Sequence, residues 1–384
     1  MMKKQISSVL VCLLLSCVLT GCWDRTEINH YAFWMGTFLE KDMDNKVKVS
    51  AQIAIPSRIG FSGKQGSGKD RGNIVVSSTG RTLMDTCQTI QDKLPRRLFI
   101  GHRRALFIGG ELAKEGIEDS LDMYTRNMDT SLRTSAFVVV GKDPEMILKV
   151  NSPFDPFSSN AAVDQEKYSK NGDKVLRDFI VAEESETQCP ILSVIDTDTI
   201  DKEAAEQLFE IKKLAVFNKK EKLVGFLTEK ESLITLRLLD RLKQRILTEY
   251  ISEGKGYITL TETNLSVKMN TSVDQDQVSV HIRLASIGSV EENWTNLDLM
   301  SPTSLQMVQD VMQKQLEQAV IESIQKIQKV YKTDVFGFGE AVHRQHPYQW
   351  KKIKKDWAQL FPEAKVTVEV VLKIERVGAQ GKRT

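Results

Sequence analysis

A cysteine near the start of the chain has the setting of a lipid attachment site. The run Leu19-Thr20-Gly21-Cys22 closes a mostly apolar stretch over residues 6–19, which follows Lys3 and Lys4. That stretch is shorter than the ~20 residues that cross a bilayer, so it is typical of a cleaved signal peptide. A small residue before cysteine is what a lipoprotein-processing peptidase requires. The sequence therefore predicts a signal peptide over 1–21 and a lipid anchor on Cys22, the first residue of the mature chain.

A glycine-rich segment has the spacing of a phosphate-binding loop. Gly63-Lys64-Gln65-Gly66-Ser67-Gly68-Lys69-Asp70 ends in a carboxylate, where a hydroxyl group should reach magnesium. The segment also leads into a strand pattern rather than into the helix whose N-terminus would hold phosphate. We therefore interpret it as a surface loop, and we expect shortening of residues 62–71 to be tolerated.

Three histidines could take part in metal binding or catalysis, but their surroundings do not favour either. His343 and His346 have helical spacing, yet Pro347 biases His346 toward an extended conformation. His102 lacks an identifiable nucleophile partner in the sequence. We interpret all three as structural residues, and the sequence predicts no enzyme, no metal site and no cofactor.

A tryptophan-bearing basic segment follows Pro347. Trp350, Ile353 and Trp357 fall on one side of a helix that carries four lysines elsewhere. Such a helix can lie on an anionic bilayer, or it can be a core helix with a solvated back. We favour the core helix, because a short helix beside a strand is ordinary domain architecture.

Charge and cysteine content narrow the class of protein. Without residues 1–21 the chain carries 51 basic and 51 acidic residues. This balance argues against nucleic acid as a partner, since such binding needs a concentrated positive surface. Besides Cys22, the mature chain has Cys87 and Cys189, which could pair outside the cell. Cys87 lies on the apolar side of a helix pattern, which favours a buried thiol.

Alternating apolar residues and helical spacings predict a chain of mixed strands and helices. The predicted strands are 31–40, 46–55, 73–78, 104–108, 135–140, 189–192, 209–218, 222–227, 257–269, 277–287 and 366–374. The predicted helices are 83–94, 111–127, 144–150, 229–248 and about 301–332. A polar turn is expected at 270–276.

These elements predict an α+β fold with three mixed domains after the signal peptide. The expected units are an N-terminal domain over 22–200, a small middle domain over 201–255 and a C-terminal domain with a long helix over 256–384.

Several short motifs lie in order along the chain: Gly21–Ile28, Gly80–Thr82, Arg97–His102, Leu112–Ile117, Lys222–Leu227, Asp334–Glu340, Trp350 and Trp357. Together they resemble the Ger(x)C family of C-subunit lipoproteins from spore germinant receptors. The resemblance implies three α+β domains on the outer face of the spore inner membrane. It also implies assembly with an integral-membrane A subunit and B subunit, no known catalytic residue, and Cys22 as the functional site.

Three functions remain open on the sequence. The first is a lipid-anchored accessory subunit that assembles or gates a nutrient-triggered receptor. The second is an independent solute-binding lipoprotein, which should show two similar α/β lobes. The third is a tethered enzyme, for which no convergent acid, base, nucleophile or metal set is identifiable.

Overall fold

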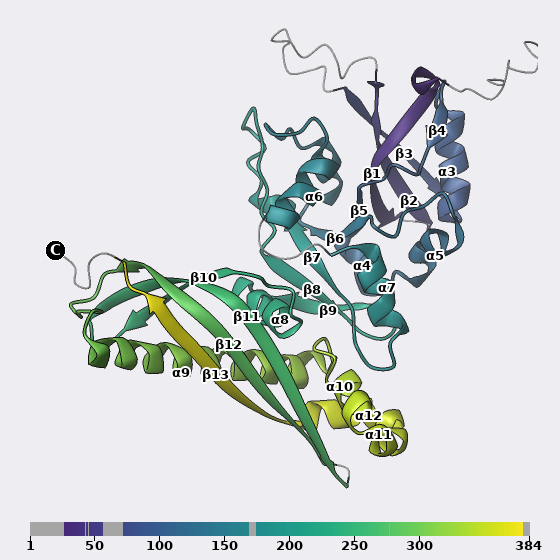
Figure 1. Cartoon of the computed structure of the whole chain (residues 1–384). Coiled ribbons are helices and arrows are strands. Elements are labelled where there is room, and N and C mark those ends of the chain that lie inside the picture. Colours follow the sequence, from purple (N-terminus) through teal and green to yellow (C-terminus); the bar gives the residue numbers. More distant parts are fainter. Residues whose placement is uncertain are drawn as a thin grey trace, which may run out of the picture.

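The computed structural model describes residues 27–42, 44, 46–56, 72–168, 174–275 and 277–378. Cys22, the signal peptide and the glycine-rich loop at 63–70 lie outside these residues. The described chain forms an α+β fold around two mixed sheets, which confirms the predicted fold class (Figure 1). Within the described ranges, no helix is long and apolar enough to span a bilayer.

The first sheet has nine strands among the described residues, in the order β3-β2-β1-β5-β6-β7-β8-β9, with β4 paired to β1. Its centre is parallel, from β1 through β5 and β6 to β7, and both flanks are antiparallel. The strands are β1 (Tyr31–Lys41), β2 (Val47–Ala54), β3 (Asn73–Gly80), β4 (Arg97–Phe99), β5 (Ala105–Gly109), β6 (Ser135–Val140), β7 (Ile191–Asp196), β8 (Lys213–Phe217) and β9 (Leu223–Leu227).

Helices cover both faces of this sheet, so its central strands are buried throughout, as all five residues of β5 show. Leu106 and Ile108 pack with α3, α4, α5 and α7 on one face, whereas Phe107 packs with η2 and α6 on the other. The helical segments are η1 (Ile28–His30), α3 (Leu83–Asp92), α4 (Gly110–Glu115), α5 (Glu118–Arg126), η2 (Pro144–Lys149), α6 (Ser158–Tyr168), α7 (Leu176–Glu184) and η3 (Thr197–Thr199).

The second sheet has four strands in the order β10-β11-β12-β13, and only its last pair is parallel. Its strands are β10 (Arg245–Ile251), β11 (Gly256–Asp274), β12 (Gln277–Asn293) and β13 (Lys365–Arg376). The remaining helices are α8 (Glu229–Leu238), α9 (Pro302–Lys326), η4 (Ile327–Tyr331), α10 (Phe338–Gln345), α11 (Pro347–Ile353), η5 (Lys354–Asp356), α12 (Trp357–Leu360) and η6 (Phe361–Glu363).

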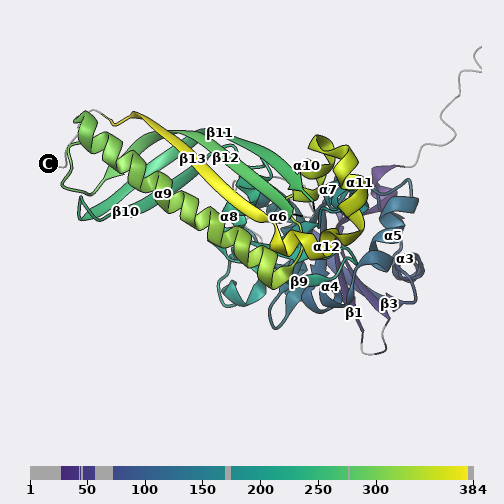
Figure 2. The ribbon, with the colours of Figure 1, turned by 90° about the horizontal axis from the view of Figure 1, so that it is seen from below.

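The long helix α9 covers the outer edge of β13 (Figure 2). Side chains from successive turns of α9 accept hydrogen bonds from β13 amides: Gln313 Oε1 from Leu372 N at 2.9 Å and Glu317 Oε1 from Val370 N at 2.9 Å. An edge strand with free amides would otherwise be open to pairing with another chain. The helix therefore accepts hydrogen bonds from the amides of this edge strand, and it also packs on the core of the second sheet.

The hairpin of β8 and β9 joins the two halves of the molecule. Ala215 and Phe217 pack in the core on one face of the first sheet, while Leu214 and Val216 pack in the core of the second. The range 201–255 thus contributes this hairpin to the first sheet and β10 to the second. Its expected role as a small middle domain stays a prediction.

Three element predictions were wrong in detail. The expected helix 229–248 ends at Leu238, and the chain turns at Asp240 (φ 55°) into strand β10. The expected helix 111–127 is broken at Gly116 (φ 125°) into α4 and α5. The polar turn expected at 270–276 is shorter, because β11 continues to Asp274.

Candidate functional site

The strongest sequence motif, Asp334 to Glu340, lies where the two sheets meet. The Asp334 carboxylate accepts hydrogen bonds from the first two amides of α10, Phe338 N at 3.0 Å and Gly339 N at 2.8 Å. It also accepts one from Trp357 Nε1 at 3.2 Å. Gly337 has φ 73°, a left-handed conformation that favours glycine. The motif therefore forms a tight turn, which the buried Asp334 carboxylate and the ring of Trp357 hold in place.

Burial of Asp334 raises the pKa of its carboxyl group to about 6, although the three hydrogen bonds favour the charged form. Its backbone oxygen accepts a hydrogen bond from Cys189 N at 2.8 Å, which ties the motif to the segment before β7. Burial and the nearby Asp334 charge raise the pKa of the Cys189 thiol to about 12. A thiol that stays protonated near pH 7 is a poor nucleophile.

The other cysteine in the described chain is also buried. Cys87 packs in the core on one face of the first sheet, and burial raises its pKa. Cys87 and Cys189 are both free thiols. The prediction of a buried Cys87 thiol is confirmed.

Glu186 connects the first half of the chain to α10 and α11. Its carboxylate accepts hydrogen bonds from Trp350 Nε1 at 2.6 Å and from Lys354 Nζ at 3.0 Å. The hydrogen bond from Trp350 is the main reason that the Glu186 pKa is lowered. The His343 ring stacks on the Trp350 ring, with 5.7 Å between centroids, and its Nδ1 lies 3.7 Å from Glu186. His343 thus has structural partners on both sides.

The remaining predicted residues of this region are also in structural roles. His346 Nε2 lies 2.6 Å from the Thr271 backbone oxygen. Trp350, Ile353 and Trp357 are buried, so the basic segment packs on the core with a solvated back, as we favoured, although it forms α11, η5 and α12 rather than one helix. In the described ranges, no group of three or more histidine, cysteine or acidic side chains is placed to hold a metal ion.

Two further contacts hold the hairpin β8–β9 and α8 against the end of α9. The Tyr331 hydroxyl donates to the Phe226 backbone oxygen at 2.8 Å, and its ring lies directly over Gly225, where a Cβ would overlap it. Lys326 Nζ lies 2.8 Å from Glu231 Oε1. The two sheets are therefore joined by hydrogen bonds, an ion pair and a shared apolar core.

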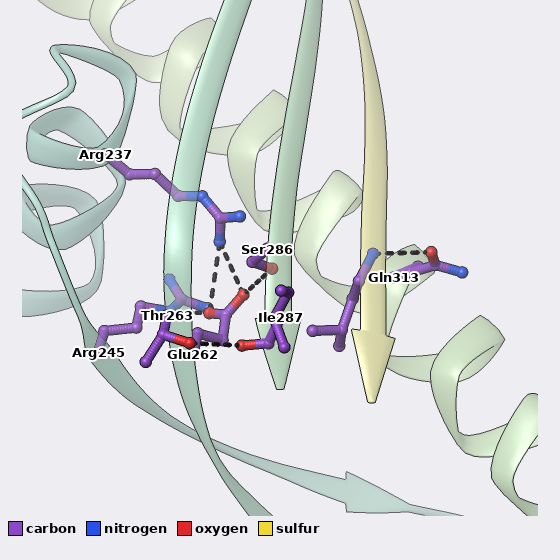
Figure 3. Close-up of polar contacts among 8 residues, drawn as sticks. Arg237, Arg245, Glu262, Thr263, Ser286, Ile287 and Gln313 are labelled. Atoms are coloured by element: carbon purple, nitrogen blue, oxygen red, sulfur yellow. Dashed lines mark hydrogen bonds and ion pairs between the residues drawn. The ribbon is translucent and has the colours of Figure 1, made fainter. Parts of the chain in front are cut away.

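A buried ionic cluster lies inside the second half of the chain, and sequence reasoning missed it (Figure 3). The Glu262 carboxylate accepts hydrogen bonds from Arg237 Nη1 at 3.1 and 3.3 Å, Arg245 Nε at 2.6 Å and Ser286 Oγ at 2.7 Å. Burial would raise the Glu262 pKa, but the charges of Arg245 and Arg237 outweigh burial and lower it. The cluster connects α8, β10, β11 and β12.

His102 lies away from this junction. Its side chain is exposed at the start of the first sheet, and its ring is 6.2 Å from the Phe33 ring. Tyr31, Phe33 and Phe99 form an aromatic group beside it. Within the part of the chain that is described, no hydrogen bond joins His102 to a serine or cysteine.

Two family models match the chain in order, and the second includes the hairpin of β8 and β9. Residues 24–197 match the model described as spore germination protein N-terminal domain, and residues 212–378 match spore germination B3/GerAC like, C-terminal. A solved structure titled "Crystal Structure of the GerBC protein" aligns with a TM-score of 0.58 at 16% identity, covering 91% of this chain and 100% of that one. The fold is therefore that of GerBC.

Curated relatives from Bacillus subtilis (strain 168) align over nearly their whole length. Spore germination protein KC is 27% identical over 401 residues, covering 98% of this chain and 97% of that protein. Spore germination protein B3 is 23% identical over 385 residues, covering 99% of this chain and 100% of that protein. The chain belongs to the Ger(x)C family, as the motif resemblance predicted.

Proposed function

We propose that this protein is the lipid-anchored C subunit of a nutrient germinant receptor. The observation that carries the proposal is full-length similarity to spore germination proteins KC and B3, with both family models matched in order. In this proposal a lipid on Cys22 holds the protein on the outer face of the spore inner membrane. There it assembles with the integral-membrane A and B subunits and helps to gate the complex.

Exposed apolar side chains near the first described residue support the anchor. Ile28 is 67% exposed, Met128 is 99% exposed and Phe154 is 87% exposed. Phe99, 39% exposed, packs edge-on against Tyr31 at the start of β1.

These side chains come from separate loops that meet at one end of the first sheet. A Cβ on Gly101 would lie 3.2 Å from the Asp129 oxygen and 3.3 Å from the Phe99 ring, which places the Met128 loop beside Phe99. The Phe154 loop reaches the same end of the sheet, since Asn73 Nδ2 donates to the Pro156 oxygen at 2.7 Å.

This end of the molecule is suited to lie against a bilayer. Arg97 is exposed next to the aromatic group, and aromatic and basic side chains together suit the headgroup region of a bilayer. Cys22 precedes the first described residue by five positions, which is at most about 18 Å of extended chain. A lipid on Cys22 would hold the exposed apolar loops near the headgroups.

The junction supports a role through contact rather than chemistry. Because the Asp334 backbone oxygen, Glu186 and Tyr331 tie the two halves together, a partner that binds the second sheet is held at a set position relative to the membrane. The alternative of an independent solute-binding lipoprotein is less well supported. Its two lobes should be similar, whereas these sheets differ in strand number and topology.

The proposal is tested by replacing the anchor residue. We expect Cys22→Ala to fold, to leave the membrane fraction and to lose both the co-purifying subunits and the germination response. Cys12→Ala is the matched control, because it changes a cysteine within the predicted signal peptide and should have no effect. Mass spectrometry of the mature N-terminus reports the lipid directly. An unmodified N-terminal cysteine, or a Cys22→Ala protein that stays on the membrane, would refute the anchor.

A further inference from the structure

An acidic hollow lies between α5, the end of α7 and the turn that joins β8 to β9. Its volume is about 1410 Å³. Eight of the side chains that line it are acidic and three are basic. The three basic side chains are already in ion pairs: Lys41 with Glu115, Arg81 with Asp85 at 3.4 Å and Arg126 with Asp122 at 2.6 Å. The hollow therefore has excess negative charge.

The other acidic side chains that line the hollow make no ion pair with any described residue. They are Glu118, Asp119, Asp129, Glu183, Glu184 and Glu221. Glu118 and Asp119 are in the first turn of α5, where the helix dipole favours them. Glu183 and Glu184 are in the last turn of α7, where the dipole disfavours acidic side chains. Lys219 Nζ donates to the backbone oxygens of Glu183 and Ser185 at this end of α7, whereas the Glu183 and Glu184 carboxylates stay without an ion pair.

Glu221 is the deepest of these acidic residues. The residue is only 7% exposed, and its Oε2 has no hydrogen-bond partner among the described residues. The backbone is held by a hydrogen bond from Ile117 N to the Glu221 oxygen at 3.3 Å, with φ 50°. A buried carboxylate oxygen without a hydrogen-bond partner destabilises the folded protein, so its presence here calls for an explanation.

Lys219, whose charge opposes the rise of the Glu221 pKa, makes no ion pair with the Glu221 carboxylate. Lys219 Nζ donates instead to backbone oxygens at the end of α7, including Ser185 O at 2.7 Å. Burial raises the Glu221 pKa, and the charges of Glu183, Glu118 and Asp119 raise it further, to about 7, against an opposing effect of Lys219. The carboxyl group is therefore poised between its charged and neutral forms near neutral pH.

We propose that this hollow binds the ammonium or guanidinium group of an organic cation, with the Glu221 carboxylate as its deepest contact. The carboxylates line a wide hollow, and no three of them in the described chain converge as metal ligands do. This arrangement suits a cation that carries several hydrogen-bond donors along its length. The cation belongs either to a free amine or to a lysine or arginine side chain of a partner subunit.

Titration calorimetry of the full chain in detergent with cadaverine, a diamine, tests the site. A cation beside Glu221 stabilises its charged form, so binding near pH 7 should release protons. The measured heat should then change with the ionisation enthalpy of the buffer. We expect Glu221→Gln to weaken binding at least tenfold and to abolish the proton release. Glu253→Gln, at an exposed position outside the hollow, is the matched control and should bind like the wild type.

A second measurement identifies the source of the cation and shows that Glu221→Gln is folded. We expect this variant to melt no lower than the wild type, because it removes a buried charge without changing shape. Loss of co-purifying subunits in Glu221→Gln assigns the cation to a partner, whereas unchanged co-purification assigns it to a free amine. Absence of cadaverine binding, or binding that Glu221→Gln leaves unchanged, would overturn the proposal. Neither of these two cadaverine-binding results depends on whether Cys22 carries a lipid.

Discussion

Replacing Glu262 with glutamine should be among the most destabilising single changes in this chain. The substitution keeps the shape of the side chain but removes the negative charge that two arginines share. The Arg237 and Glu262 side chains are 0% exposed, and that of Arg245 is 8% exposed. Solvent therefore cannot replace the lost charge, and two buried guanidinium groups remain without a counter-charge.

The expected loss is about 3–5 kcal/mol in the free energy of unfolding, the usual cost of breaking a buried ion pair. Because the two halves share a core, the fall in melting temperature should be smaller than the roughly 6–20 °C that a unit of 150–250 residues would show. Urea unfolding followed by circular dichroism measures the change, and hydrogen exchange of β11 and β12 amides locates it. Glu253→Gln, on the exposed turn after β10, is the control and should stay within about 0.5 kcal/mol.

A triple variant shows whether stability is lost because buried charges are left unpaired or because the cluster itself is required for folding. Replacing Arg237, Glu262 and Arg245 together with methionine or leucine removes all three buried charges, and stability should return to about the wild-type value or exceed it. The lowered Glu262 pKa also means that its stabilisation is present above the unfolded pKa and is lost as pH falls through the folded value. A Glu262→Gln protein that loses less than about 1 kcal/mol would refute this reasoning.

Four further predictions concern other positions. Gly225→Ala would place a Cβ in the Tyr331 ring, so we expect a loss of about 1–3 kcal/mol in a urea titration; an unchanged midpoint would contradict this. The Asp334 pKa, raised to about 6, makes the wild type lose stability relative to Asp334→Asn as pH rises from about 4 to 6, and parallel pH profiles would exclude it. The Glu221 pKa, raised to about 7, likewise makes the wild type lose stability relative to Glu221→Gln as pH rises to about 7. The difference in melting temperature between the two proteins measures this loss. Shortening residues 62–71 should leave melting and germination nearly unchanged, and a large loss in either would disprove our interpretation of the loop.

Regular patterns made much of the fold predictable from the sequence. Strict alternation of apolar residues along β2 and a helical stripe along α9 each report a face that packs on a core, so both elements were placed within a few residues. The final strand and the hairpin at 213–227 were found in the same way. What alternation does not report is which sheet a strand joins, since β8 has apolar residues on both faces.

The strand that the sequence missed, β10, has a charged residue in an interior position. Buried and exposed positions alternate at the start of strand β10, but the first buried residue is the charged Arg245. The alternation of apolar and polar residues that identifies a strand in a sequence is therefore interrupted there. Arg245 is interior because Glu262 on the neighbouring strand neutralises it. A cluster built from residues distant in sequence leaves no local signature. The same holds for Glu221, whose burial depends on α5 and α7 packing around the hairpin turn.

The sheet that crosses the boundary between the two family models limits how this protein can be divided. One model ends at residue 197, after β7, and the other begins at 212, before β8, although β7 and β8 are hydrogen-bonded from Ile191↔Val216 to Val194↔Lys213. Separately expressed halves would each present a long open strand edge, the feature that promotes self-association and aggregation. Mixed while unfolded and then refolded together, the same halves have complementary edges, so fragment complementation rather than independent folding is the behaviour that this architecture favours.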